Sequence, residues 1–84
     1  MSFNPNISAQ IVVQQLPESG QQHKVLAHLI HRGSISQLEA RNTYRVERLT
    51  SRVTELKKRG VAIKREMRLD ESRHKYARYF LVNG

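Results

Sequence analysis

Apolar residues recur at helical spacing between Gln21 and Arg32. One face of a helix over this stretch would collect four of them, Val25, Leu26, Leu29 and Ile30. Ser19 is a good N-cap with Gln22 three residues later, which is the spacing of a capping box. Gly33 stands where a helix commonly ends. The pattern predicts a helix from about Gln21 to Arg32 with one buried face.

A second, shorter helix is predicted to begin at Ser36. Ser36 and Glu39 form another capping box, and Ile35 and Leu38 supply apolar contacts. We expect this helix to end near Asn42, because asparagine tolerates the left-handed conformation that a tight turn needs.

A longer apolar stripe predicts a third helix from about Tyr44 to Arg59. Its members follow one another at steps of three, four and three residues: Val46, Leu49, Val53 and Leu56. Gly60 follows, and the last turn is rich in cations, which suits the negative end of the helix dipole.

After Gly60 the apolar positions change to a period of two. They alternate first through Val61 and Ile63, and again from Tyr76 to Val82, with a polar turn between. This predicts a β-hairpin with a basic tip. We expect its aromatic residues to fill the core face of the sheet, the alternative being a platform on which single-stranded bases stack. These residues are Tyr76, Tyr79 and Phe80.

The first eighteen residues differ from the rest of the chain. They contain no Lys or Arg, two prolines and many Asn and Gln residues. We interpret residues 1–18 as a flexible N-terminal arm and residues 19–84 as one folded domain. The apolar residues Ile11 to Val13 offer an alternative, an edge strand or a segment that docks on a partner.

The charge of the chain is concentrated in its second half. Of 84 residues, 15 are Lys or Arg and 7 are Asp or Glu, which gives a net charge of +8. Residues 1–44 contribute three basic and two acidic residues, and residues 45–84 contribute twelve and five. This distribution indicates a polyanionic partner for the third helix and the hairpin, with nucleic acid as the first choice.

Several function classes are excluded or disfavoured by composition. The absence of cysteine excludes disulfides, zinc fingers and thiol catalysis, and it fits a reducing cytoplasm. His28 and His31 lie three residues apart but lack a third ligand, so we predict no metal and no cofactor. There is no phosphate-binding glycine loop and only one aspartate, so we predict no catalytic residues and no enzyme. The longest apolar run, three residues, predicts no membrane partner.

Three helices followed by a basic two-stranded antiparallel hairpin form an α+β arrangement that looks like a winged helix-turn-helix domain. Over residues 19–82 the chain also resembles a family of small phage and prophage helix-turn-helix proteins. The resemblance lies in Val25–Leu29, Gly33–Ser36, Leu38–Ala40, Arg48–Gly60 with Ile63, and Lys75–Leu81. Members are generally taken to bind DNA, so the resemblance implies a recognition helix over 44–59 and a wing over 61–82. The family often places a glycine in the turn before the recognition helix, where this chain has Arg41-Asn42-Thr43-Tyr44.

Arginines at positions 48 and 52 would lie one turn apart on the exposed side of the third helix. Arginine can bind guanine in the major groove through two hydrogen bonds. Cations of the hairpin are expected to reach phosphates or the adjacent minor groove. The predicted DNA-binding residues are Tyr44, Arg45, Arg48, Ser51, Arg52, Lys58, Arg59, Lys64, Arg68, Arg73 and Lys75.

The sequence therefore predicts a sequence-specific binder of double-stranded DNA, a small phage-type transcriptional regulator located in the cytoplasm and at the nucleoid when bound. A weak or DNA-dependent homodimer is expected, with Ile11–Leu16 as its contact. Alternatives within DNA binding are an excisionase-type or replication-type architectural factor. From another class, the chain fits an inhibitor or adaptor of a host protein. RNA binding ranks lowest, because an A-form major groove excludes a helix.

Overall fold

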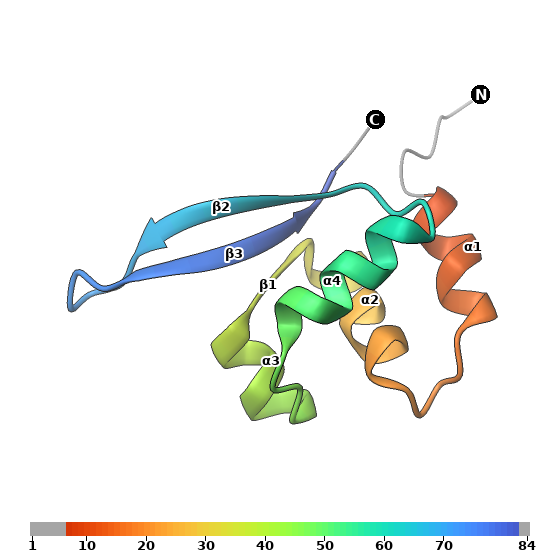
Figure 1. Cartoon of the computed structure of the whole chain (residues 1–84), viewed down its shortest axis with the longest axis horizontal. Coiled ribbons are helices and arrows are strands. Elements are labelled where there is room, and N and C mark those ends of the chain that lie inside the picture. The colour runs from red at the N-terminus through yellow and green to blue at the C-terminus, as the bar shows by residue number, and fades with distance from the viewer. Residues whose placement is uncertain (1–6, 83–84) are drawn as a thin grey trace.

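The structure of the chain, a computed structural model, describes residues 7–82 (Figure 1). Within them lie four helices and three strands. In chain order they are α1 (Ile7–Gln15), α2 (Gln21–Arg32), β1 (Ser34–Ser36), α3 (Gln37–Tyr44), α4 (Leu49–Lys58), β2 (Ile63–Leu69) and β3 (Lys75–Leu81). No helix in this part of the chain is both long and apolar enough to cross a membrane.

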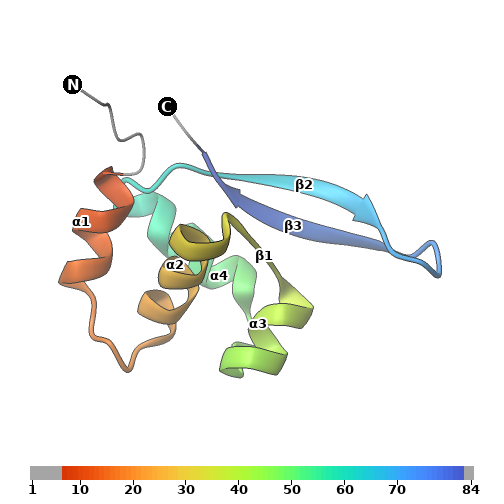
Figure 2. The same cartoon turned by 180° about the vertical axis from the view of Figure 1, so that it is seen from behind.

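The sheet is antiparallel, with β3 in the centre between β1 and β2. Strand β1 covers only the inner end of β3, where Ile35 lies opposite Tyr79. Strands β2 and β3 pair along their whole length, from Ile63 opposite Leu81 to Leu69 opposite Lys75. We call this hairpin the wing, and its outer half extends past the helices in both views (Figures 1 and 2).

One core joins the helices to the inner end of the sheet. Its largest fully buried side chains come from α2, β1, α4 and the turn before α4: Leu26, Leu29, Ile35, Leu49, Leu56, Val25 and Val46. The predicted fold, helices followed by a hairpin, is confirmed, with β1 and α1 as additions. Strand β1 is only three residues long, and the period-two pattern cannot stand out over so short a segment.

The segment predicted as a flexible arm or an edge strand contains a packed helix. Helix α1 lies against α2 at the end of the molecule remote from the wing tip (Figures 1 and 2). Ala9 and Val12 of α1 and Leu16 just after it are buried in the common core. The helix has no charged residue in its first or last turn, so its stability depends on this packing. Residues 1–6 of the predicted arm lie outside the described residues.

Helix α2 has the predicted bounds but a different N-cap. Gly20, not Ser19, occupies the cap position in an extended conformation, and no side chain caps the helix. The capping box predicted from Ser19 and Gln22 is therefore wrong. The Gly20 amide donates to the Pro17 carbonyl, which shows that a turn leads into the helix. The predicted C-terminal glycine is confirmed: Gly33 has a φ of 85° and donates to the Leu29 carbonyl.

The predicted third helix is shorter than expected and begins at Leu49 instead of Tyr44. Tyr44 is instead the last residue of α3, and Arg45 takes the left-handed conformation, with a φ of 59°, that was expected at Asn42. In the sequence, Val46 has the spacing of a first member of the apolar stripe of the predicted third helix. In the structure it is buried in the core but lies in the turn between α3 and α4. The Gln37 side chain fixes this turn, donating to the Val46 carbonyl at 2.7 Å and accepting from the Leu49 amide at 2.9 Å.

The four residues compared with the family's glycine turn, Arg41 to Tyr44, form the end of α3 instead. Arg45 follows them in the turn, and its conformation is costly for a residue with a Cβ. The left-handed conformation costs an L-residue roughly 1–2 kcal/mol, and glycine avoids this cost. Glycine also loses more backbone entropy on folding, so the net gain in stability is smaller than the cost removed. We expect Arg45→Gly to raise the free energy of unfolding by about 0.5 kcal/mol in urea denaturation. An Arg45→Gly protein less stable than the parent, with Arg45→Ala unchanged, would contradict this account.

Candidate nucleic-acid interface

Helix α4 packs through the stripe predicted for it and leaves the opposite side exposed. Leu49, Val53 and Leu56 are buried. At about 100° per residue, the direction away from them is shared by Ser51, Thr54 and Lys58. Thr54 and Lys58 are exposed and Ser51 is half-buried, while Thr50 and Lys57 flank that side towards the sheet and are exposed. Of these, sequence reasoning missed Thr50 and Thr54, because it centred the face on the arginines; it expected Lys57, with Lys58, to approach the DNA backbone.

Two predicted residues, Arg45 and Arg48, lie in the turn before α4. Both are exposed, and Arg48 is the N-cap, with a non-helical backbone. The predicted pair at positions 48 and 52 is therefore not one turn of a helix. Arg48 projects from the N-terminal end of α4, the end that recognition helices commonly bring to base edges.

Three other predicted residues are engaged within the protein. The Arg52 guanidinium pairs with Glu55 at 3.1 Å and donates to Gln21 of α2 at 3.4 Å. The Arg59 Nε donates to the Gln22 side chain at 3.2 Å. These contacts fasten α4 to the start of α2, and they turn both arginines away from the exposed side of α4.

The third engaged residue is Tyr44. It is half-buried, and its hydroxyl shares a hydrogen bond of 2.8 Å with His28 Nδ1. The two rings meet edge to face, with centroids 5.5 Å apart. Tyr44 therefore joins the end of α3 to α2.

The cations of the hairpin divide between the two faces of the sheet. Tyr79 is buried and its hydroxyl bonds to Thr50 of α4 at 2.9 Å, so the face carrying Tyr79 is the helix-facing face. By strand register, Arg65 and Lys75 share that face. Lys64 and Arg68 lie on the outer face, where both stand over the Phe80 ring, and Arg68 also pairs with Glu66 at 3.6 Å.

The aromatic residues follow the same division. Only Tyr79 is buried in the core; Tyr76 and Phe80 lie half-buried on the outer face. The prediction that all three fill the core face is therefore wrong for two of them. The alternation of a strand places position 79 opposite in direction to 76, 78 and 80.

The tip of the wing is built around an acidic residue. Asp70 accepts from the His74 amide through its side chain at 2.8 Å and from the Arg73 amide through its carbonyl at 3.0 Å. Arg73 has a φ of 62°, which closes the turn without glycine. Arg73 and His74 are exposed at the tip, where His74 Nδ1 lies 3.9 Å from a carboxylate oxygen of Asp70.

Most cations of the second half have no carboxylate partner within residues 7–82. Those without an ion pair are Arg45, Arg48, Lys57, Lys58, Arg59, Lys64, Arg65, Arg73 and Lys75. They lie in the turn before α4, at the end of α4 and along the wing. Arg65 is an addition to the predicted set. Arg65 lies two residues after Ile63, so the alternation of the strand places both on the same face.

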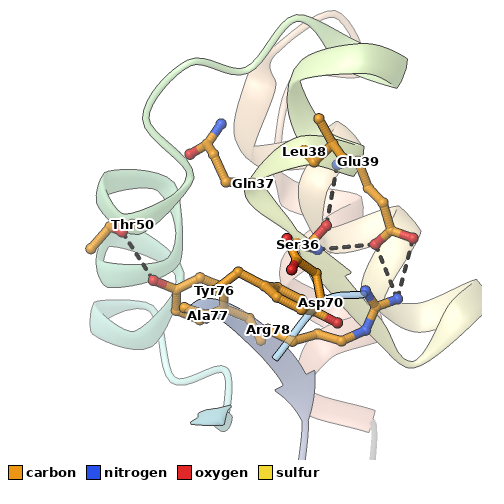
Figure 3. A pocket seen from close by; sticks show the side chains of 10 residues that line it. Ser36, Gln37, Leu38, Glu39, Thr50, Asp70, Tyr76, Ala77 and Arg78 are labelled. Carbon is orange, nitrogen blue, oxygen red and sulfur yellow. Dashed lines mark hydrogen bonds and ion pairs between the residues drawn. The ribbon is translucent and has the colours of Figure 1, made fainter. Parts of the chain in front are cut away.

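A polar cluster joins the inner end of the sheet to α3 (Figure 3). The predicted capping box is confirmed: Ser36 Oγ accepts from the Glu39 amide, and Glu39 accepts from the Ser36 amide. Glu39 also pairs with Arg78 at 3.1 Å, and Arg78 donates to Ser34 at 2.9 Å. Glu39 thus holds the start of α3 against the central strand.

Two groups in this region have shifted pKa values. Burial raises the pKa of Glu39, but the Ser36 amide and the Arg78 guanidinium together outweigh it and hold the pKa below 4.5. Burial lowers the pKa of His28 below 6.5, an effect that nearby Glu39 partly opposes and Arg32 and Arg78 reinforce. In the folded chain Glu39 is therefore charged and His28 neutral at pH 7.

Both shifts predict that the free energy of unfolding decreases as the pH is lowered. Each folded pKa lies below its unfolded value, so each contribution is complete above the unfolded pKa and is lost as the pH falls through the folded one. We expect urea denaturation to give a lower free energy of unfolding at about pH 4 than at about pH 7. In Glu39→Gln the decrease below about pH 4.5 should be smaller. An unchanged pH profile in that variant would show that Glu39 does not contribute.

Fold and surface together define a class of protein: a winged helix-turn-helix domain, in which α3 and α4 are the helix-turn-helix and β2 and β3 the wing. A family model described as a winged helix-turn-helix domain matches residues 20–84, and the chain belongs to that family. This fold is a DNA-binding fold. No curated protein and no solved structure matches the chain.

Proposed function

We propose that the protein is a sequence-specific binder of double-stranded DNA that acts as a small transcriptional regulator, without enzymatic activity or cofactor. One observation carries the proposal: cations without acidic partners gather on the turn before α4, the end of α4 and the wing. Unpaired cations on a helix-turn-helix and its wing favour a polyanion of matching shape, and duplex DNA is that polyanion.

In the proposed complex the N-terminal end of α4 enters the major groove. Arg48 is the residue best placed to bind a guanine edge. Ser51 and Thr54, whose side chains are shorter, follow it along α4 and would contact neighbouring base edges. Lys58, at the far end of the same side, approaches the phosphate backbone. The wing contacts the flanking backbone and the adjacent minor groove, which would bring the protein to the nucleoid.

This arrangement distinguishes residues that would bind base edges from arginines that hold the fold together. We expect Arg48→Ala to weaken binding of a specific duplex by about tenfold to hundredfold, and Lys58→Ala to weaken all duplexes alike. Arg52→Ala should instead lower the melting temperature, because Arg52 fastens α4 to α2. Fluorescence anisotropy with specific and scrambled duplexes measures the first two effects. Loss of sequence preference in Arg52→Ala alone, with Arg48→Ala unaffected, would contradict the assignment.

A DNA-dependent homodimer remains part of the proposal, because one small domain reads only a short site. The contact proposed for it, Ile11–Leu16, is reduced in the structure: Val12 and Leu16 belong to the core. A dimer would therefore depend mainly on two half-sites placed at a fixed spacing on the DNA.

A second candidate function is an inhibitor or adaptor of a host protein. The observation that favours it is a hollow between the start of α3 and β3, which Leu38, Tyr76 and Ala77 line with others (Figure 3). Leu38 is 64% exposed there. A stable complex in a lysate that Leu38→Asp abolishes, without an effect on DNA binding, would favour this candidate.

A further inference from the structure

The wing carries two large apolar side chains that the core does not use. Met67 is 56% exposed and Leu69 is 61% exposed. They lie two residues apart on β2, so they share one face, with Ala77 and Lys75 opposite them on β3. Their neighbours on the same strand, Glu66 and Arg68, point to the other face.

The face of Met67 and Leu69 is the helix-facing face. Tyr79 belongs to it and bonds to Thr50 of α4 at 2.9 Å. The outer half of the hairpin extends past the helices (Figures 1 and 2). On the face that also carries Tyr79, Met67 and Leu69 line a hollow of the wing, together with Arg68 and Lys75. A duplex that contacts α4 and the wing together would meet this face.

The charges of the wing favour the same side. On the helix-facing face, Arg65 and Lys75 flank the apolar pair and form no ion pair within residues 7–82. On the outer face, by contrast, Arg68 pairs with Glu66 and Arg78 pairs with Glu39. An apolar pair between unpaired cations matches a polyanion with an apolar interior, which is the chemistry of stacked bases between two phosphate strands.

We propose that Met67 and Leu69 form a wedge that enters the minor groove, partly unstacks one base step and bends the duplex. This inference rests on the proposed function. Minor-groove binders often insert Met or Leu between base steps in this way. The minor groove is only about 6 Å wide, narrower than a two-stranded ribbon, so the groove must open if the wing enters it.

The reach of the wing fits this placement. Leu69 lies four residues beyond Arg65, about 13 Å along the strand. Half a helical turn of DNA, the step from one groove to the next, is about 17 Å. Arg65 lies opposite Tyr79, where the sheet contacts α4, so the apolar pair covers most of this step towards the next groove.

A second copy of the chain is the other occupant that an apolar face suggests. A stable interface buries about 800 Å² on each partner. Two half-exposed side chains beside unpaired cations do not supply an area of that size. Like charges would also face each other across a symmetric contact through the wings.

The test uses the full chain and duplexes of about 30 base pairs that carry 2-aminopurine beside a flexible TA step and a dye pair at the ends. We expect the parent protein to raise the 2-aminopurine fluorescence several-fold and to shorten the end-to-end distance. Met67→Gln/Leu69→Gln should still bind, within about tenfold in affinity, but lose both signals. Ile11→Gln, at a side chain 50% exposed on α1, is the matched control and should retain both.

Since all three positions are exposed, equal melting temperatures will show that the fold is intact. Binding by the parent protein with no change in either signal would overturn the wedge but leave the proposed function standing. Equal signals from the parent and the double variant would do the same. A parent dimer that the double variant dissociates would overturn the wedge in favour of a protein contact. Absence of any duplex binding would overturn the proposed function and the wedge together.

Discussion

Replacing Val12 and Leu16 together by alanine is expected to lower the free energy of unfolding by about 3–5 kcal/mol. Both side chains are buried, with 6% of their surface exposed, in the core that α1 shares with α2. Truncation removes their buried surface and leaves a cavity that the surrounding helices fill only in part. Because small domains are stable by only about 5–15 kcal/mol, the loss should be large enough to see directly.

Urea denaturation followed by circular dichroism measures this effect. Ile11→Ala is the matched control: it lies on the same helix but half-exposed, and should change stability by no more than about 0.5 kcal/mol. Equal stabilities of the double variant and the control would mean that α1 is not part of the folded core.

The affinity for duplex DNA is expected to fall by about a thousandfold between 0.05 and 0.2 M salt, if about six phosphates are contacted. Each cation that touches a phosphate contributes about 0.9 to the slope of log affinity against log salt. Lys58→Gln/Lys75→Gln removes one cation from α4 and one from the wing. The fall over the same range should then be about tenfold smaller.

The matched control removes the same amount of charge from α2. Lys24 and Arg32 are exposed there and form no ion pair within residues 7–82. Lys24→Gln/Arg32→Gln should leave the slope nearly unchanged, because screening weakens charges more than about 10 Å from the DNA. If both double variants reduced the slope equally, the binding would reflect net charge rather than this interface.

Sequence patterns predicted those elements that local residue order determines. Helix α2, the capping box at Ser36 and the hairpin follow from periodicity and caps. The start of α4 did not follow, because Val46 satisfies the helical stripe from a turn. That turn depends on Gln37, whose contacts are nine and twelve residues away in the chain and leave no local signal. Helix α1 was not predicted, because its apolar face is small and is buried only by packing against α2, which the local sequence does not show.

The sequence predicted which elements carry the positive charge of the candidate interface, but not which way their arginine side chains point. Counting charges places the cations in α4 and the hairpin. Only the fold shows that Arg52 and Arg59 turn towards α2, where they donate to Gln21 and Gln22. These two hydrogen bonds join residues more than thirty positions apart, so the pattern of α4 alone does not show them.

Selection from a random library of duplex DNA, followed by sequencing, tests the central claim most directly. The account predicts one recovered motif, which Arg48→Ala weakens or relaxes at a defined base pair while Lys24→Gln leaves it unchanged. Two copies of the motif at a fixed spacing would indicate a dimer on DNA. Recovery of no motif, with binding that is weak and falls steeply with salt, would contradict sequence-specific recognition by α4.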